Sequence, residues 1–97
     1  MGLMNKTWVL YILECADSTL YTGITTDLDR RLSEHNSSPR GARYTRTRRP
    51  VSVLASWDLP SRSAAAQAEA RFKRLDRAHK LGVVAGTQPP PWRTSAR

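Results

Sequence analysis

Two short β-favouring segments near the start of the chain place the strongest constraint on its fold. The first, residues 8–13, is the continuous apolar run WVLYIL, and the second, residues 20–24, reads LYTGI. Residues 16–19, ADST, separate them and are typical of a turn. A run as short and apolar as the first suits a central strand buried on both faces. We therefore predict an antiparallel hairpin with a loop of roughly four or five residues.

A helix is expected directly after this hairpin. Leu28 and Leu32 lie four residues apart and form its apolar stripe. Thr26 and Asp29 stand at the spacing of a capping box, which predicts where the helix begins. Residues 36–39, NSSP, end it.

A third strand and a second helix complete the expected fold. Residues 51–57, VSVLASW, predict the strand, and Pro60 ends it. The helix is predicted from about residue 64 to about residue 80. The order β-β-α-β-α predicts an α/β (α+β) fold with a three-stranded, largely antiparallel sheet flanked by helices. The residues expected along one side of the second helix are Ala68, Phe72, Leu75 and His79.

The length of the chain, 97 residues and 10.9 kDa, allows one small domain. We place that domain at residues 8–84, after an N-terminal extension at residues 1–7. Residues 85–97 contain three consecutive prolines and no hydrophobic periodicity, so they predict a disordered tail.

The positive charge of the chain limits what it binds. Sixteen Lys and Arg residues, thirteen of them Arg, stand against eight Asp and Glu residues, which gives a net charge of +8. The hairpin is almost neutral, and the excess lies in residues 25–97. Such a net positive charge attracts polyanions, and the planar guanidinium group of Arg matches the geometry of phosphate. We expect nucleic acid as the partner, first DNA and otherwise RNA, with an anionic membrane surface as the weaker alternative.

Several classes of protein are excluded by what the sequence lacks. Cys15 is the only cysteine, which excludes a disulfide framework and a cysteine-based zinc site and fits a reducing compartment. No apolar run approaches the roughly 18 residues of a membrane span, and the first residues lack the core of a signal peptide. We therefore expect a cytoplasmic, soluble domain.

Glu69 is the most informative acid in the sequence. It lies inside the predicted second helix, next to Ala68 and three residues before Phe72, so it borders the apolar side. A carboxylate at such a position needs a partner, because an unpaired buried charge is costly. The simpler interpretation is a salt bridge to Arg71, Lys73 or another Arg. The more specific interpretation is a site for a hard cation such as Mg²⁺, which keeps most of its bound water molecules.

Tyr11 and Tyr21 lie on the two paired strands, which can bring their phenols together. Sheet packing alone would account for two isolated tyrosines. The pKa of a phenol is about 10, so either tyrosine can serve as a base only if nearby cations lower it. The chain is rich in such cations.

The first helix and the segment after it supply the candidate phosphate contacts. Arg31 and His35 are one turn apart and share a helix face, with Arg31 as a phosphate clamp and His35 as a proton carrier or phosphate contact. A solvated face and a helix-end histidine are the simpler alternatives. Residues 40–49, RGARYTRTRR, predict a mobile phosphate-contacting loop whose Tyr44 stacks on a base. The candidate nucleic-acid contacts are Arg30, Arg40, Arg43, Tyr44, Arg46, Arg48, Arg49 and Lys73.

Together these residues resemble the GIY-YIG nuclease superfamily. Residues 9–11, VLY, correspond to its first motif, and residues 21–23, YTG, to its second. The stretch LYTGITTDLDRRLSEHN, followed by GARYTR, RRPV and AEARFKRL, looks like the small stand-alone GIY-YIG proteins of bacteria. The resemblance covers roughly residues 8–82 and implies a β-β-α-β-α domain whose hairpin carries both tyrosines.

The resemblance also implies metal-dependent cleavage of a phosphodiester bond, with Mg²⁺ or Mn²⁺ as the cofactor. We expect one-step hydrolysis in which Tyr21, or Tyr11, accepts a proton from the attacking water. A phosphate clamp and the metal then offset the charge of the transition state. The positions that match the family are its metal-binding glutamate at Glu69, its phosphate-binding arginine at Arg31, its paired tyrosines at Tyr11 and Tyr21, and a histidine found in many members at His35.

The sequence leaves two functions open. The first is a metal-dependent endonuclease acting on branched, damaged or single-stranded DNA in repair or recombination. The second is a nucleic-acid-binding module of the same fold with little or no catalysis, which delivers a partner protein to such DNA. A purely structural protein ranks last, because it leaves the joint presence of both tyrosines, Arg31, His35 and Glu69 as coincidence.

Overall fold

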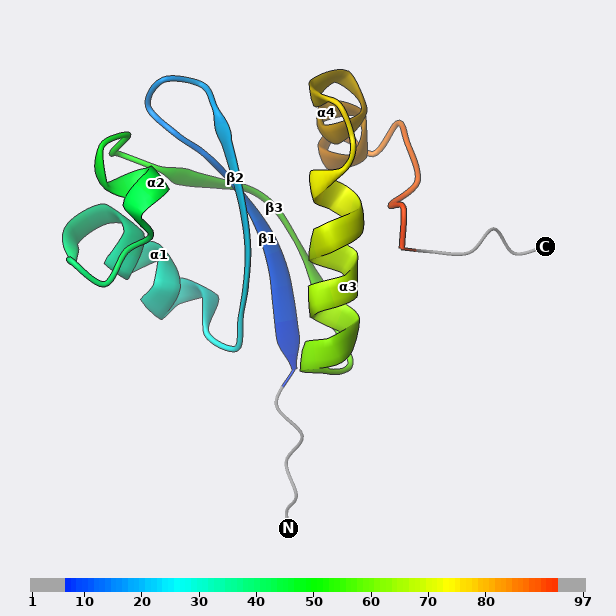
Figure 1. Cartoon of the computed structure of the whole chain (residues 1–97), viewed down its shortest axis with the longest axis horizontal. Coiled ribbons are helices and arrows are strands. Elements are labelled where there is room, and N and C mark those ends of the chain that lie inside the picture. Colours follow the sequence, from blue (N-terminus) through cyan, green and yellow to red (C-terminus); the bar gives the residue numbers. More distant parts are fainter. Residues whose placement is uncertain (1–6, 93–97) are drawn as a thin grey trace, which may run out of the picture.

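A three-stranded antiparallel sheet forms the centre of the protein (Figure 1). The computed structural model describes residues 7–92. The strands lie in the order β2-β1-β3, with both neighbouring pairs antiparallel, which confirms the predicted sheet and its flanking helices. The elements are β1 (Trp8–Glu14), β2 (Leu20–Thr25), α1 (Leu28–Ser37), α2 (Arg43–Arg46), β3 (Ser52–Leu59), α3 (Arg62–Lys73) and α4 (Arg77–Ala85).

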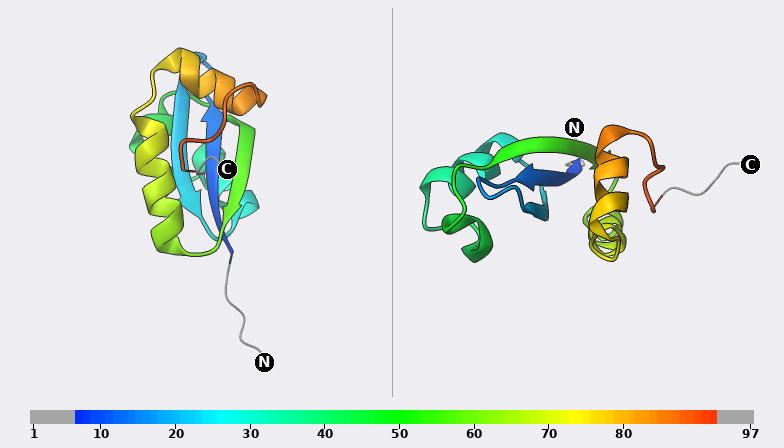
Figure 2. Two further views of the ribbon diagram at one scale, coloured as in Figure 1. Left: turned by 90° about the vertical axis from the view of Figure 1, so that its right-hand side faces the viewer. Right: turned by 90° about the horizontal axis from the view of Figure 1, so that it is seen from above.

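Strand β1 is buried on both faces because helices lie on both sides of the sheet (Figure 2). Successive side chains of a strand point to opposite faces. Leu10 and Ile12 therefore point to the α3 side, where they pack with its alanines and phenylalanine. Tyr11 and Leu13 point to the other side, where the leucines of α1 lie. The predicted central strand is confirmed, and its two faces separate Tyr11 from the core beneath α3.

The N-cap of helix α1 is one residue after the predicted cap, Thr26. Asp27 is the N-cap, and its carboxylate accepts the amide N–H of Arg30 at 3.1 Å. Thr25, rather than Thr26, supports this turn by accepting the amide N–H of Asp27 at 3.1 Å. The Thr26–Asp29 capping box is therefore wrong, because the Asp27 side chain already satisfies the free amide.

The predicted second helix is two helices. Ser61 caps α3, which ends at Lys73, and Asp76 caps α4 by accepting the amide N–H of His79 at 2.8 Å. An aspartate that binds the amide three residues later favours a new helix start, so a single helix to residue 80 is wrong. Ala68 and Phe72 are buried as predicted, whereas His79 is exposed.

The end of the described chain folds back onto the sheet. Helix α4 ends at Ala85, followed by Gly86 in the left-handed conformation at φ 83°. The Trp92 ring packs edge-on against Trp57, with centroids 5.1 Å apart. The structure thus differs from the predicted disordered tail over residues 85–92, because an aromatic core contact holds the segment. Residues 93–97 of that tail, and all but Thr7 of the predicted N-terminal extension, lie outside the described residues.

Within residues 7–92, no helix combines the length and the apolar character needed to cross a membrane.

Candidate active site

The side chain of Tyr11 crosses the edge strand of the sheet at a glycine. Tyr11 pairs with Gly23 of β2 across the hairpin, and β2 is at the edge of the sheet. A Cβ atom on Gly23 would lie 2.5 Å from the Tyr11 hydroxyl oxygen and 2.6 Å from Cζ. Only glycine leaves room for the phenol on this path. The glycine of the second motif therefore lets Tyr11 reach the edge of the sheet.

This geometry predicts the effect of Gly23→Ala. The new methyl group must displace a buried ring, which we expect to lower the free energy of unfolding by about 1–3 kcal/mol. Urea denaturation measures this cost in the wild-type and in a Tyr11→Leu background. Because the shorter leucine side chain has no atoms at the phenol position, the cost should largely vanish there. An equal cost in both backgrounds would mean that the phenol is not what Gly23 accommodates.

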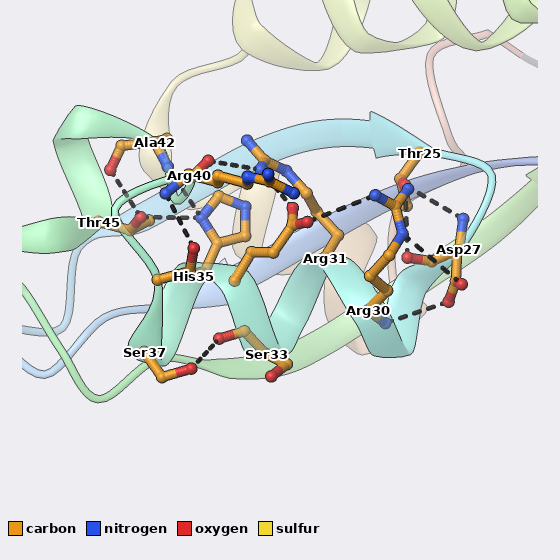
Figure 3. A network of polar contacts seen from close by, with 12 residues as sticks. Thr25, Asp27, Arg30, Arg31, Ser33, His35, Ser37, Arg40, Ala42 and Thr45 are labelled. Atoms are coloured by element: carbon orange, nitrogen blue, oxygen red, sulfur yellow. Dashed lines mark hydrogen bonds and ion pairs between the residues drawn. The ribbon is translucent and has the colours of Figure 1, made fainter.

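A buried chain of hydrogen bonds holds the Tyr11 phenol. The Tyr11 hydroxyl is 2.9 Å from His35 Nε2, and His35 Nδ1 is 2.8 Å from the Thr45 hydroxyl oxygen. Thr45 in turn donates its hydroxyl proton to the Ala42 carbonyl at 2.9 Å (Figure 3). These three side chains are at most 1% exposed. The chain links β1, α1 and α2 at a single point.

The hydrogen-bond pattern assigns the proton on the His35 ring. Since the Thr45 hydroxyl donates to Ala42, its oxygen accepts from His35 Nδ1–H, and Nε2 is left to accept the Tyr11 O–H. The Ala42 amide N–H also faces Nδ1, at the longer distance of 3.4 Å, and the shorter Thr45 contact takes precedence. Tyr11 therefore donates and His35 accepts.

Burial sets the protonation states of this pair. Burial, and after it the nearby Arg31 charge, lowers the pKa of His35 to about 4. Burial also raises the pKa of Tyr11 to about 12, together with the neighbouring Tyr21, although Arg31 opposes the shift. At neutral pH the imidazole is neutral and the phenol keeps its proton. The condition for a tyrosine base, a pKa lowered by cations, is thus not met at Tyr11, and His35 is too buried to be a direct phosphate contact.

The two tyrosines lie together, as the hairpin predicted. The Tyr11 and Tyr21 ring centroids are 6.4 Å apart, and the Tyr21 ring lies edge-on to His35 at 5.0 Å. Tyr44 of α2 extends the cluster, at 6.0 Å from Tyr21. Tyr11 is buried and Tyr21 only half-buried, so Tyr21 is the more accessible of the two rings.

Arg31 is held at this cluster by its own helix and by the following loop. Its Nη1 atom lies 2.8 Å from Glu34 Oε1 and 2.8 Å from the Arg40 carbonyl oxygen (Figure 3). The guanidinium is also near enough to Tyr11 to lower its pKa. The hydrogen bond from Arg31 lowers the pKa of Glu34. The arginine is therefore fixed in place beside the phenol.

Glu69 belongs to α3, on the other face of the sheet from the α1 leucines that pack with Tyr11, but it lies within electrostatic reach of the phenol. Its carboxylate charge contributes to the raised pKa of Tyr11, and α3 packs against β2 and β1. Glu69 Oε2 forms an ion pair with Lys73 Nζ at 3.2 Å, with 24% of the glutamate side chain exposed. The salt bridge to Lys73 foreseen from the sequence is thus present, and it lies beside the tyrosines.

The donors around Glu69 suit only one kind of metal. Within the described residues, no group of three or more His, Cys, Asp or Glu side chains could hold a metal ion. A hard cation such as Mg²⁺ keeps several waters and needs one or two carboxylates in addition to substrate phosphate. Glu69 meets that requirement, and the exposed Lys73 ammonium can turn away to admit the ion. The residues present therefore fit Mg²⁺ or Mn²⁺ at Glu69.

Two of the candidate phosphate contacts instead hold the fold together. The Arg49 guanidinium donates to the carbonyls of His35 at 2.6 Å and Ser38 at 2.6 Å, at the end of α1. Arg48 forms an ion pair with Asp17 at 3.0 Å, and its guanidinium lies 3.9 Å from the Tyr44 ring centroid. These contacts make residues 40–49 a held segment containing α2. The predicted loop therefore contains a short helix, α2, and two of its five arginines, Arg48 and Arg49, bind backbone and side chains of the same chain.

The remaining basic candidates are exposed to varying degrees. Arg30 forms ion pairs with Asp27 at 3.7 Å and Glu34 at 3.4 Å, and more than half of its side chain is exposed. The exposed candidates on the loop before α2 and on α2 itself are Arg40, Arg43, Tyr44 and Arg46.

Thr45 is a site residue that sequence reasoning missed. It is fully buried and links His35 to α2. The sequence around it, RYTR, shows only basic and aromatic neighbours, so nothing in the local pattern singles out the threonine. Its role depends on a contact between residues ten positions apart.

Comparisons with known proteins agree with the motifs and the geometry. Residues 7–81 match the family described as the GIY-YIG catalytic domain. The chain belongs to this family of nuclease domains. Its curated relatives are small bacterial proteins named UPF0213, a name that states no activity.

Relatives of similar length share about half of their residues with this chain. The UPF0213 protein of Desulfotalea psychrophila is 48% identical over 84% of this chain and 74% of its own. One from Streptococcus pyogenes is 51% identical over 89% of this chain and 94% of its own.

Two solution NMR structures have the same fold. The UPF0213 protein BH0048 of Bacillus halodurans matches with a TM-score of 0.55 and 43% identity, covering 87% of this chain and 88% of that one. The protein EF2693 of E. faecalis matches with a TM-score of 0.58 and 39% identity, over 84% and 86%.

Proposed function

We propose that this protein is a metal-dependent endonuclease that hydrolyses phosphodiester bonds in DNA. The observation that carries the proposal is the buried Tyr11–His35 hydrogen bond, with Arg31 and Glu69 close enough to shift the pKa of the phenol. A proton acceptor, a phosphate clamp and a carboxylate then lie at one edge of the sheet. Phosphodiester hydrolysis needs this combination.

The proton of the attacking water passes through Tyr11 in this mechanism. A phenol with a pKa of about 12 is protonated at neutral pH, so Tyr11 can accept a proton only while giving up its own. His35 Nε2 accepts that second proton only transiently, since it already receives the hydrogen bond and its pKa is about 4. Water oxygen forms the new bond to phosphorus as the bond to the leaving oxygen breaks. The proton returns from His35 to Tyr11, and one proton passes from there to the leaving oxygen.

Charge on the phosphate is balanced by two groups that lie within electrostatic reach of the phenol. Arg31 is fixed by Glu34 and by the Arg40 carbonyl, so it can meet the non-bridging phosphate oxygens without reorganising. Glu69 would hold Mg²⁺ or Mn²⁺, and the ion would supply Lewis-acid stabilisation of the developing negative charge. Exposed arginines on α1 and α2 guide the DNA backbone toward this edge.

Glu69→Gln tests the proposal. It keeps the size of the side chain but removes the charge, and we expect DNA cleavage to fall about 100-fold, because several kcal/mol of transition-state stabilisation depend on a bound metal. Purified protein is incubated with labelled single-stranded, duplex and branched DNA and Mg²⁺ or Mn²⁺. Asp58→Asn, an exposed carboxylate on β3 at the opposite edge of the sheet, is the matched control and should cleave normally.

Equal cleavage by wild type and Glu69→Gln would contradict the proposal and point to a contaminating nuclease. Salt-sensitive binding of every DNA form without cleavage would favour the alternative, a binding module. The Lys73–Glu69 ion pair supports that alternative, since Lys73 already neutralises the carboxylate that would bind the metal. If the protein is such a binding module, Lys73→Met, which removes this ion pair, should not produce cleavage.

A further inference from the structure

We propose that a pocket beside this site binds one nucleotide that has left the base stack, with its base against Tyr21 and Tyr44 and its phosphate on Lys73 and Lys80. The inference rests on the proposed function, because it takes the strand held there to be the one that is cut. It adds to that function a substrate class, namely a DNA strand with an unstacked nucleotide next to the scissile phosphate.

The pocket lies where four elements meet. Its volume is about 260 Å³, and its lining comes from β2, α2, α3 and α4. This volume is slightly below the roughly 300 Å³ at which sites for small ligands begin, so the pocket can take at most one nucleotide and not a stacked base pair. The residues that line it are Leu20, Tyr21, Thr22, Tyr44, Lys73 and Lys80.

The chemistry of the lining matches a nucleotide. The described lining contains two aromatic rings and two ammonium groups and no carboxylate. Aromatic side chains that hold single strands stack on bases of any sequence, and lysines beside them neutralise phosphate. A base without phosphate would leave the lysines unused, and a phosphate without a base would leave the rings unused.

Both aromatic side chains are held in place before a ligand arrives. Arg48 lies over the Tyr44 ring at 3.9 Å and is itself bound to Asp17, so Tyr44 keeps its orientation although it is 38% exposed. Tyr21 is fixed by its edge-on contact with His35 at 5.0 Å. Little side-chain entropy is therefore lost when a base contacts them.

The two lysines differ in how they are engaged. Lys73 forms an ion pair with Glu69, whereas Lys80 Nζ lies 6.0 Å from the Phe72 ring centroid, at the outer limit of a cation–π contact. Lys80 therefore keeps its hydrogen-bond donors for a ligand. Lys73 connects the pocket to the candidate metal-binding carboxylate, and Tyr21 connects it to the Tyr11–His35 pair. A nucleotide in the pocket is thus next to the phosphate that these residues face.

Binding of a mononucleotide tests the pocket without any need for cleavage. Deoxyadenosine 5′-monophosphate, deoxyribose 5-phosphate and inorganic phosphate are titrated into the full chain, and amide shifts are followed by NMR. We expect the mononucleotide to shift the amides of Leu20 and Thr22 and to bind about tenfold more tightly than the other two, because stacking contributes about 1–3 kcal/mol per base. Tyr44→Ala and Lys80→Met should each weaken it about tenfold.

Arg71→Met is the matched control, since it removes one charge from the exposed surface of α3 outside the pocket. Equal binding of all three ligands would overturn the base contact. Unchanged mononucleotide binding in both pocket variants would overturn the site. These outcomes do not depend on catalysis, so they are distinct from failure of the Glu69→Gln experiment.

Cleavage tests the substrate class. An abasic analogue is placed at successive positions around the cut in a single strand. We expect one position next to the cut to slow wild-type cleavage about tenfold and to have no effect on Tyr44→Ala. Cleavage of uninterrupted duplex at the rate of single strand would overturn the requirement for an unstacked nucleotide.

Discussion

Tyr11→Phe is expected to cleave DNA about 1,000-fold more slowly than the wild type, within the range that a positioned proton acceptor contributes. The substitution removes one oxygen and keeps the ring that fills the space above Gly23. It also leaves the buried His35 Nε2 without its donor, so we expect a loss of about 1–3 kcal/mol in unfolding free energy. Cleavage rates under single-turnover conditions, at a temperature where both proteins are folded, measure the catalytic part.

Tyr21→Phe is the control that decides between the two tyrosines. The Tyr21 hydroxyl is not needed in a relay from Tyr11 to His35, so its removal should slow cleavage far less. If Tyr21→Phe is the slower variant, Tyr21 is the proton acceptor and the relay is wrong. Circular dichroism of both variants shows whether the fold is retained.

The stability of the protein is expected to fall by about 3 kcal/mol as the pH drops from 6.5 to 4, because of His35. Burial, then the charge of Arg31, lowers the pKa of the folded-state imidazole to about 4, from the ordinary value of 6.5. Between these values the unfolded chain binds a proton that the folded protein excludes. The stabilisation is thus fully present above pH 6.5 and is lost as the pH falls through the window.

Urea denaturation between about pH 4 and pH 7.5 measures this dependence, with His35→Gln as the variant that lacks the titration. The pKa values of Asp17, Glu34 and Asp76 are also lowered, so these carboxylates act mainly at and below the acid end of the range. The slope between about pH 5 and pH 6.5 should therefore disappear in His35→Gln. An unchanged slope would show that the imidazole is not the group responsible.

The sequence by itself determined the hairpin, the sheet and the family. A continuous apolar run suits burial on both sides, so residues 8–13 indicated the central strand. Pairing with the next strand then brought Tyr21 close to Tyr11, two residues from its partner Gly23. These are local signals. The break between α3 and α4 was also encoded locally, in Asp76, but the helical periodicity around it obscured the cap.

Only the tertiary structure decided what individual polar residues do. Arg48 and Arg49 belong to a run of charges that looks uniform along the chain, yet they bind Asp17 and the end of α1. Nothing in the sequence next to His35 or Thr45 indicates that their side chains are buried. The direction of a pKa shift depends on which groups surround a side chain, and those neighbours come from distant parts of the sequence. For Tyr11 the burial supplied by β2 and α1 outweighs the nearby arginine, which a count of charges could not show.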